Sequence, residues 1–112
     1  MGYKFEKLEI WELALAYIDL FYQIAEKLPQ IEKRNLGSKA LRAPTSIALN
    51  TAEGSTGQSN AEQNRFIGIA IRSLVETVAC LHLMKRRNYI DKRYVSTVLF
   101  LERAAFWKTS GC

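Results

Sequence analysis

The first third of the chain repeats apolar residues at steps of three and four. Between residues 9 and 28 two such rows run side by side, and most polar residues fall opposite them. This period is that of an amphipathic α-helix, and Pro29 ends it because proline cannot continue the hydrogen-bond ladder. The rows consist of Trp11, Ala14, Ile18, Phe21, Ala25 and Leu28, and of Ile10, Leu13, Tyr17, Leu20 and Ile24.

A thinner apolar pattern predicts a second helix over about 33–53, ending at Gly54. Its row is built mainly from small residues, which allow a neighbouring helix to approach closely. Pro44 falls inside this pattern, so we expect it to kink the helix or to mark its first turn.

Capping signals place two further helices. Ser59 with Glu62 three residues later has the form of a capping box, and the apolar period that follows predicts a third helix over 60–87. Asp91 is expected to cap a fourth helix over 91–108.

No stretch shows the two-residue alternation that strands need. The sequence therefore predicts an all-α protein with one domain over residues 1–112, folded as an antiparallel up-down four-helix bundle. The helices over 9–28 and 91–108 carry more apolar surface than one bundle core absorbs. Because wide exposed apolar patches usually mark an interface, we expect a homo-oligomer.

Charge is distributed unevenly along the chain, which has a formal net charge of +5. Residues 1–32 carry three basic and six acidic side chains, whereas residues 33–112 carry thirteen basic and five acidic ones. A basic body behind an acidic first segment indicates polyanionic partners.

Other sequence signals exclude several classes of protein. Cys80 and Cys112 form no disulfide framework and no C-x-x-C motif. The first apolar stretch is broken by Glu12 and Asp19, unlike a signal peptide. The longest run without a charge, 43–52, is far shorter than the roughly 18 residues that a membrane span needs. We expect a soluble, cytoplasmic protein without a membrane partner.

Catalytic and metal-binding patterns are missing from the sequence. A di-metal carboxylate bundle pairs a Glu with a His three residues later, but the lone histidine, His82, follows Glu76 by six. No nucleophile elbow occurs, and the 54–57 loop lacks the Lys-Ser/Thr of a phosphate-binding loop. We therefore expect no enzyme, no catalytic residue, no metal and no cofactor.

A polar row interrupts the small-residue helix over 33–53, with Glu76 of the next helix as a further candidate partner. The row could bind a ligand, or it could form a hydrogen-bonded layer in the bundle or at a subunit contact, with Arg42 paired to Glu53 or Glu76. We favour the structural layer, because buried polar groups need partners. The residues assigned to this layer are Arg42, Ser46, Asn50, Glu53 and Glu76.

Five cations gather around the turn between the third and fourth helices. Two cations would be enough to complement the negative end of a helix dipole, whereas five repel one another until an anion relieves them. Tyr89 and Tyr94 lie among them and could stack on bases. We therefore predict a nucleic-acid contact made by Lys85, Arg86, Arg87, Lys92 and Arg93, with Arg65 and Arg72 assisting.

At residues 42–54 the sequence resembles a known family. This run resembles the Arg-Ala-Ala-x-Ser-Ile-x-x-Asn-Ile-Ala-Glu-Gly signature of the 23S rRNA-intervening-sequence proteins. Phe5, Leu8, Trp11 and Ala14 are similar to the opening pattern of that family, and the Ser-x-x-Glu run at 73–76 is similar to its third helix. Tyr89 with Ile90 is similar to its closing turn. The likeness covers nearly the whole chain.

The resemblance implies an up-down four-helix bundle that assembles into a ring, a pentamer, without catalysis. A related group, the accessory variability determinants of diversity-generating retroelements, comprises basic pentameric bundles that bind nucleic acid and a reverse transcriptase. The chain departs from the family pattern at three places: Pro44 replaces Ala, Arg72 stands where Gly is common, and residues 55–64 carry no Lys or Arg. Its positive charge lies instead on the third helix and the following turn.

We expect a non-enzymatic, ring-forming bundle that binds the phosphate backbone of RNA, DNA or both without reading sequence. It would be accessory to a ribonucleoprotein or a reverse transcriptase. The alternative is a protein-interaction scaffold whose basic surface docks an acidic protein and never meets nucleic acid. A small enzyme is the remote third hypothesis, because the metal and triad spacings are absent.

Overall fold

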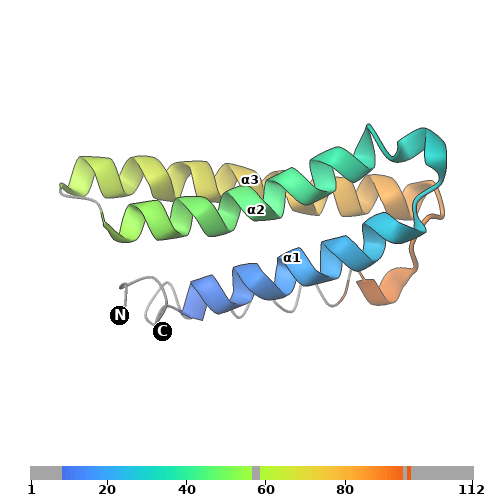
Figure 1. Cartoon of the computed structure of the whole chain (residues 1–112), viewed down its shortest axis with the longest axis horizontal. Coiled ribbons are helices and arrows are strands. Elements are labelled where there is room, and N and C mark those ends of the chain that lie inside the picture. The colour runs from blue at the N-terminus through green and yellow to red at the C-terminus, as the bar shows by residue number, and fades with distance from the viewer. Residues whose placement is uncertain (1–8, 57–58, 95, 97–112) are drawn as a thin grey trace.

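The computed structural model describes residues 9–56, 59–94 and 96 (Figure 1). The side chains of residues 9 and 10 are not part of that description. Within these residues the fold is entirely helical, without a strand. It consists of α1 (Glu9–Lys27), a 3₁₀ turn η2 (Gln30–Glu32), α2 (Leu36–Ser55) and α3 (Asn60–Arg86).

The three long helices lie side by side, with α2 in contact with both α1 and α3. The colours of Figure 1 show that the chain runs one way along α1, returns along α2 and runs the first way again along α3. The C-terminal ends of α1 and α3 and the start of α2 therefore meet at one end of the molecule. The all-helical fold predicted from the sequence is confirmed.

The observed helices begin and end close to the predicted residues, with one difference. α1 ends one residue before the predicted limit, and the Ser59 hydroxyl accepts the backbone N–H of Glu62 at 3.1 Å, as the capping box predicts. The second helix was expected from residue 33, but α2 begins at Leu36. The chain first forms the short turn η2, in which i→i+3 bonds replace the α-helical ones, such as Glu32 N–H to Pro29 O at 2.9 Å.

Glycine at position 37 allows this turn to fold back onto α2. A Cβ atom added there would lie 3.3 Å from the carbonyl oxygen of Glu32. Pro44 is buried in the interior of α2 and is not in its first turn. The helix continues past it to Ser55. Thr45, one residue later, donates its hydroxyl to the Leu41 carbonyl at 2.7 Å.

The core lies where α1, α2 and the second half of α3 meet. Its largest fully buried side chains include Phe21 and Ile24 of α1 and Leu81 and Met84 of α3. Small residues of α2, such as Ala40, fill the space between the larger ones. Both apolar rows predicted for the first helix contribute to this core.

The buried face of α3 agrees with the apolar row expected from the sequence only in its second half. That row consists of Ile67, Ile71, Leu74, Val78 and Leu81. Leu81 is buried, and Leu74 and Val78 pack against the core, whereas Ile67 and Ile71 are more than half exposed. Thr77, Cys80 and Met84, on the neighbouring side of the helix, are also buried. The physical reason is the small-residue face of α2, which brings the backbones close and accepts small side chains such as threonine and cysteine.

α3 is the one helix in the described ranges that is long and apolar enough to cross a membrane, judged by length and composition alone. The mean hydropathy of its most apolar 18-residue window is 1.6, and only 17% of that window is buried. Core helices of water-soluble proteins pass the same test, so this is weak evidence of a membrane.

Candidate functional site

One end of the molecule collects most of the positive charge. The end of α1, the start of α2, the end of α3 and the turn after it meet there (Figure 1). These segments carry nine cations, against the three carboxylates Glu26, Glu32 and Asp91. We call this set the basic end, made of Lys27, Lys33, Arg34, Lys39, Lys85, Arg86, Arg87, Lys92 and Arg93.

Helix dipoles account for part of this charge. The C-terminal carbonyls of α1 and α3 both point toward the basic end and favour cations there. Lys33 serves this purpose directly, because its ammonium donates to the carbonyl oxygens of Ala25 at 2.9 Å and Glu26 at 3.5 Å. Lys33 therefore pairs with the carbonyls at the end of α1. Helix dipoles account for only a few of the nine cations of the basic end.

The five cations predicted to bind nucleic acid are all exposed, but α3 divides them between two sides. Successive residues of an α-helix are about 100° apart, so Lys85 and Arg87 point to nearly opposite sides of the helix end, with Arg86 between them. Lys85 lies with Lys92 along one pocket, described below. Arg86 and Arg87 continue the face of α3 that carries Arg65 and Arg72.

A Schellman motif fixes the turn on which these cations are mounted. Asn88 has a positive φ of 62°. Its N–H donates to the Lys85 carbonyl at 2.9 Å, and the N–H of Tyr89 donates to the Met84 carbonyl at 2.9 Å. These two bonds close the last turn of α3 and direct the chain back toward α1.

Replacing Asn88 tests how far this turn depends on its backbone conformation. We expect Asn88→Val to lower the free energy of unfolding by about 1–2 kcal/mol, because a β-branched residue does not tolerate a positive φ. Asn88→Gly should be as stable as the parent protein or slightly more so. Urea denaturation of both variants measures the difference, and equal losses for Val and Gly would contradict this account.

Asp91 and Arg93 form a local pair just after the turn. Asp91 Oδ2 lies 3.1 Å from Arg93 Nη2, and Asp91 Oδ1 accepts the backbone N–H of Arg93 at 2.8 Å. The side-chain hydrogen bond, followed by the backbone one, lowers the pKa of the Asp91 carboxyl, and the pairing raises the pKa of the Arg93 guanidinium. The backbone bond is the one expected of a helix cap, in agreement with the predicted role of Asp91. Beyond residue 94, most of the predicted fourth helix lies outside the described residues.

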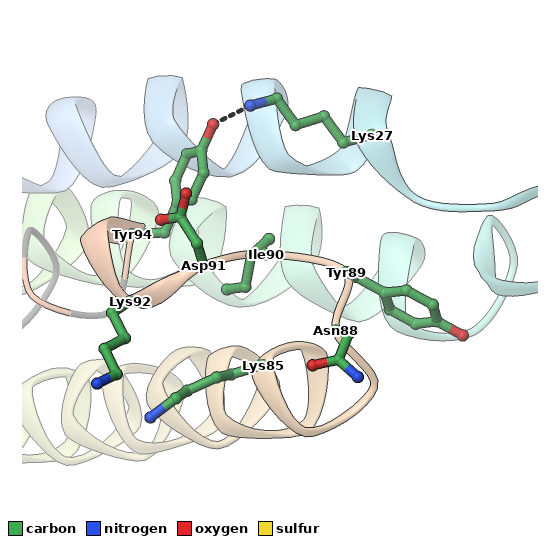
Figure 2. Close-up of a pocket in the computed structure, with 8 residues that line it drawn as sticks. All are labelled: Lys27, Lys85, Asn88, Tyr89, Ile90, Asp91, Lys92 and Tyr94. Atoms are coloured by element: carbon green, nitrogen blue, oxygen red, sulfur yellow. Dashed lines mark hydrogen bonds between the residues drawn. The ribbon is translucent and has the colours of Figure 1, made fainter.

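A pocket of about 540 Å³ opens between the end of α3, the turn and the end of α1. Figure 2 shows the ammonium groups of Lys85 and Lys92 pointing to the same side of it, whereas Lys27 lies on the far side and donates to the phenol oxygen of Tyr94. The lining residues are Lys27, Lys85, Asn88, Tyr89, Ile90, Asp91, Lys92 and Tyr94.

Sequence reasoning missed Lys27, which is separated from Tyr94 by 67 residues. Its Nζ also lies 4.6 Å from the centroid of the Tyr94 ring, which is cation–π distance. The predicted topology could have identified Lys27, because the first and third helices of an up-down bundle end at the same end of the molecule. A cation in the last turn of the first helix must then lie near the turn that follows the third.

The two tyrosines of the predicted stacking site have different surroundings. Tyr89 turns away from the lysines in Figure 2, and its hydroxyl donates to Glu32 Oε2 at 2.9 Å. This bond ties the turn after α3 to η2. Tyr94 instead lines the pocket on the side of α1, where its hydroxyl meets Lys27 (Figure 2).

Arg65 and Arg72 lie apart from the basic end. Both are exposed on α3, and the thirteen residues from Arg72 to Lys85 correspond to about 20 Å along the helix. The guanidinium of Arg65 lies 5.5 Å from the ring centroid of its neighbour Phe66. The structure thus does not bring these two arginines together with the main cluster.

The predicted polar layer is divided by the fold. Ser46 accepts the Asn50 side-chain N–H at 3.1 Å and the Ser73 hydroxyl at 2.8 Å, which links α2 to α3. Arg42, Glu53 and Glu76 are exposed, and Arg42 makes no ion pair with either glutamate in the described part of the chain. Ser73 is a member of this link that the sequence analysis did not assign.

Metal binding finds no support in the part of the chain that the structure describes. No group of three or more His, Cys, Asp or Glu side chains there is arranged to hold an ion. Cys80 is buried in the core, and burial raises the pKa of its thiol. A protonated, inaccessible thiol is a poor nucleophile.

The end of the 42–54 motif has a packing role. A Cβ atom at Gly54 would lie 3.2 Å from the Cβ of Phe66, so glycine lets the end of α2 approach α3 closely.

Comparison with curated proteins finds no match. Comparison with family models finds one, described as 23S rRNA-intervening sequence protein, over residues 6–101. The match spans most of the 112 residues, and the chain therefore belongs to the 23S rRNA-intervening sequence protein family.

Proposed function

We propose that this protein is a non-enzymatic, oligomeric bundle that binds the phosphate backbone of RNA or DNA through its basic end. The observation that carries the proposal is the concentration of nine cations against three carboxylates at one end of three packed helices. Such a density of like charge attracts a polyanion and costs stability without one. The family name, which refers to ribosomal RNA, agrees with a role near RNA.

The proposal includes the complete architecture expected from the sequence, an antiparallel four-helix bundle assembled into a pentameric ring. Two exposed faces of the described helices support contact between copies. On α1 the apolar side chains Leu15 and Tyr22 lie beside an exposed acidic row, Glu12, Asp19 and Glu26. On α3 the exposed apolar side chains Ile67, Ile71 and Val75 form one row, and the exposed Arg65 and Arg72 lie on the adjacent side of the helix, nearest to Val75.

These two faces are complementary in charge and alike in apolar character. The acidic residues of α1 recur every seven positions, as do Arg65 and Arg72, so both rows follow one side of a helix. A contact between α1 of one copy and α3 of the next is head-to-tail, and repeated contacts of that kind close a ring when the rotation between neighbours divides a full turn. We call them the acidic face and the arginine face.

A second copy also explains the apolar surface of α3 better than lipid does. Every 18-residue window of α3 contains Arg72 and Glu76, both exposed. An arginine near the centre of a membrane-spanning helix costs about 2.5–3.5 kcal/mol, whereas at a subunit contact it can face a carboxylate. We therefore propose no membrane partner and a cytoplasmic location.

The partner proposed from the family likeness is a ribonucleoprotein or a reverse transcriptase that uses this bundle as an accessory. A ring repeats the basic end once per subunit, so weak phosphate contacts add up through avidity. No side chain of the basic end belongs to a base-reading motif, and binding is proposed to be independent of sequence.

Fluorescence anisotropy with a short RNA and a duplex DNA, titrated across salt, tests the proposal. We expect log affinity to fall linearly with log salt, with a slope of about −0.9 per phosphate neutralised on duplex DNA and about −0.7 on a single strand. Absence of binding at low salt would contradict the proposal. The basic end would then have to be the docking surface for an acidic protein.

A further inference from the structure

We infer that the pocket lined by Lys27, Lys85, Lys92 and Tyr94 is a site for a terminal phosphate, the monoester at the end of a nucleic-acid strand. The inference rests on the proposed function and adds to it. The basic end as a whole would attract any phosphate backbone, whereas this pocket would distinguish a phosphorylated strand end from a hydroxyl end.

The first argument for this inference is the number of positive charges in the pocket and the segments that supply them. Three lysines reach the pocket from three segments: Lys27 from α1, Lys85 from α3 and Lys92 from the segment after the turn. The single carboxylate in the lining, Asp91, is hydrogen-bonded by Arg93 through both its backbone and its guanidinium. The lysines are therefore left with a local excess of positive charge.

The second argument is the direction in which Lys85 and Lys92 point. Lys85 and Lys92 extend to the same side of the pocket in Figure 2, and no hydrogen bond of either ammonium is seen within the described residues. Two ammonium groups on one side of a pocket suit a compact anion held between them. A phosphate monoester carries close to two negative charges at neutral pH, because its second pKa is about 6, whereas an internal diester carries one.

Tyr94 supplies a third feature on the side of the pocket opposite to Lys85 and Lys92, where its hydroxyl oxygen accepts a hydrogen bond from Lys27 (Figure 2). Its half-buried ring offers an apolar surface for the sugar or base that follows the terminal phosphate. At about 540 Å³ the pocket falls within the range of small-molecule sites.

The test compares two fluorescent RNA strands of one sequence, one with a 5′-phosphate and one with a 5′-hydroxyl, binding to the full-length protein. We expect the phosphorylated strand to bind on the order of tenfold more tightly, the gain of one charge-assisted contact. Lys85→Gln and Lys92→Gln should each bring the ratio of the two affinities toward one. Arg86→Gln is the matched control, because Arg86 is equally exposed but does not line the pocket, and it should weaken both strands alike.

A competition arm separates the two sources of a phosphate monoester. Adenosine monophosphate should displace the phosphorylated strand only at far higher concentration than the unlabelled strand does, since it lacks the rest of the backbone, and adenosine should not displace it. Equal potency of the nucleotide and the strand would assign the pocket to free nucleotides.

Equal affinity for the two RNA strands in the parent protein overturns the inference and leaves the proposed function intact. A preference that survives in both Lys85→Gln and Lys92→Gln also overturns it, because the pocket would then not be its source. If neither strand binds at low salt, the proposed function fails together with the inference.

Discussion

Reversing the charge of Arg86 and Arg87 together is expected to weaken RNA binding by on the order of a hundredfold at moderate salt. Each arginine that meets a phosphate contributes about 1.5 kcal/mol through a charge-assisted hydrogen bond, and every 1.4 kcal/mol is a factor of ten. The double variant Arg86→Glu/Arg87→Glu should also reduce the magnitude of the salt slope by about two if both side chains neutralise phosphates. Anisotropy across salt measures both quantities.

The matched control is Arg65→Glu/Arg72→Glu, which changes the charge of α3 by the same amount. These residues lie about 20 Å or more from Lys85 along the helix, beyond the roughly 10 Å over which charges act in 0.1 M salt. Because Arg65 and Arg72 also belong to the arginine face, both double variants are compared in the Ile71→Glu background, in which we expect assembly to be lost already. There the control should lose only a small part of the affinity that the first variant loses. An equal loss for both variants would mean that overall charge, and not the basic end, determines binding.

Placing a carboxylate at Ile71 is expected to break the oligomer. Ile71 is 56% exposed in the single chain and lies in the middle of the apolar row of the arginine face. In the proposed contact the introduced carboxylate would be desolvated opposite the acidic face of the next copy, at a cost of several kcal/mol. Sedimentation equilibrium should find Ile71→Glu mainly monomeric, with an unchanged helical circular dichroism spectrum.

Leu49→Glu is the control for this change. Leu49 is 57% exposed on α2, outside both proposed faces, and the substitution adds the same charge. It should leave the oligomer and the RNA affinity unchanged, whereas Ile71→Glu should also weaken RNA binding because avidity is lost. A parent protein that sediments as a monomer, or equal assembly of the two variants, would refute the proposed contact.

Sequence reasoning was most successful for the helices. Proline at 29, the Ser59 cap and the apolar period of residues 11–28 are local signals, and local signals determine where helices begin and end. It was wrong at the start of α2, because the 3₁₀ turn over Gln30–Glu32 depends on how the chain packs against Gly37. For α3 it identified Leu81 of the buried face but not Thr77, Cys80 and Met84, and it included Ile67 and Ile71, which are exposed. A period identifies an apolar row, but the partner helix decides which side is buried, and α2 selects the side of Thr77 and Cys80.

The candidate site could be predicted only in part for a similar reason. The cluster of five cations within nine residues can be recognised from the sequence alone, and it indicates the turn after α3. Their division between a pocket and an outer face depends on the angle at which each leaves the helix. The participation of Lys27 depends on a contact between residues that are far apart in the chain, and so does the link from Ser73 to Ser46.

The position of the basic end at the tip of the helices, and not along their sides, has a consequence for the proposed ring and its proposed polymerase partner. In a cyclic ring every subunit points the same way. If neighbouring copies meet side by side through α1 and α3, all the basic ends fall on one rim and none on the other. Such a ring has two chemically different faces, of which one is strongly cationic and the other is not. A nucleic acid gathered on the cationic rim leaves the opposite rim open, so a polymerase could be held there while its template is held on the other side.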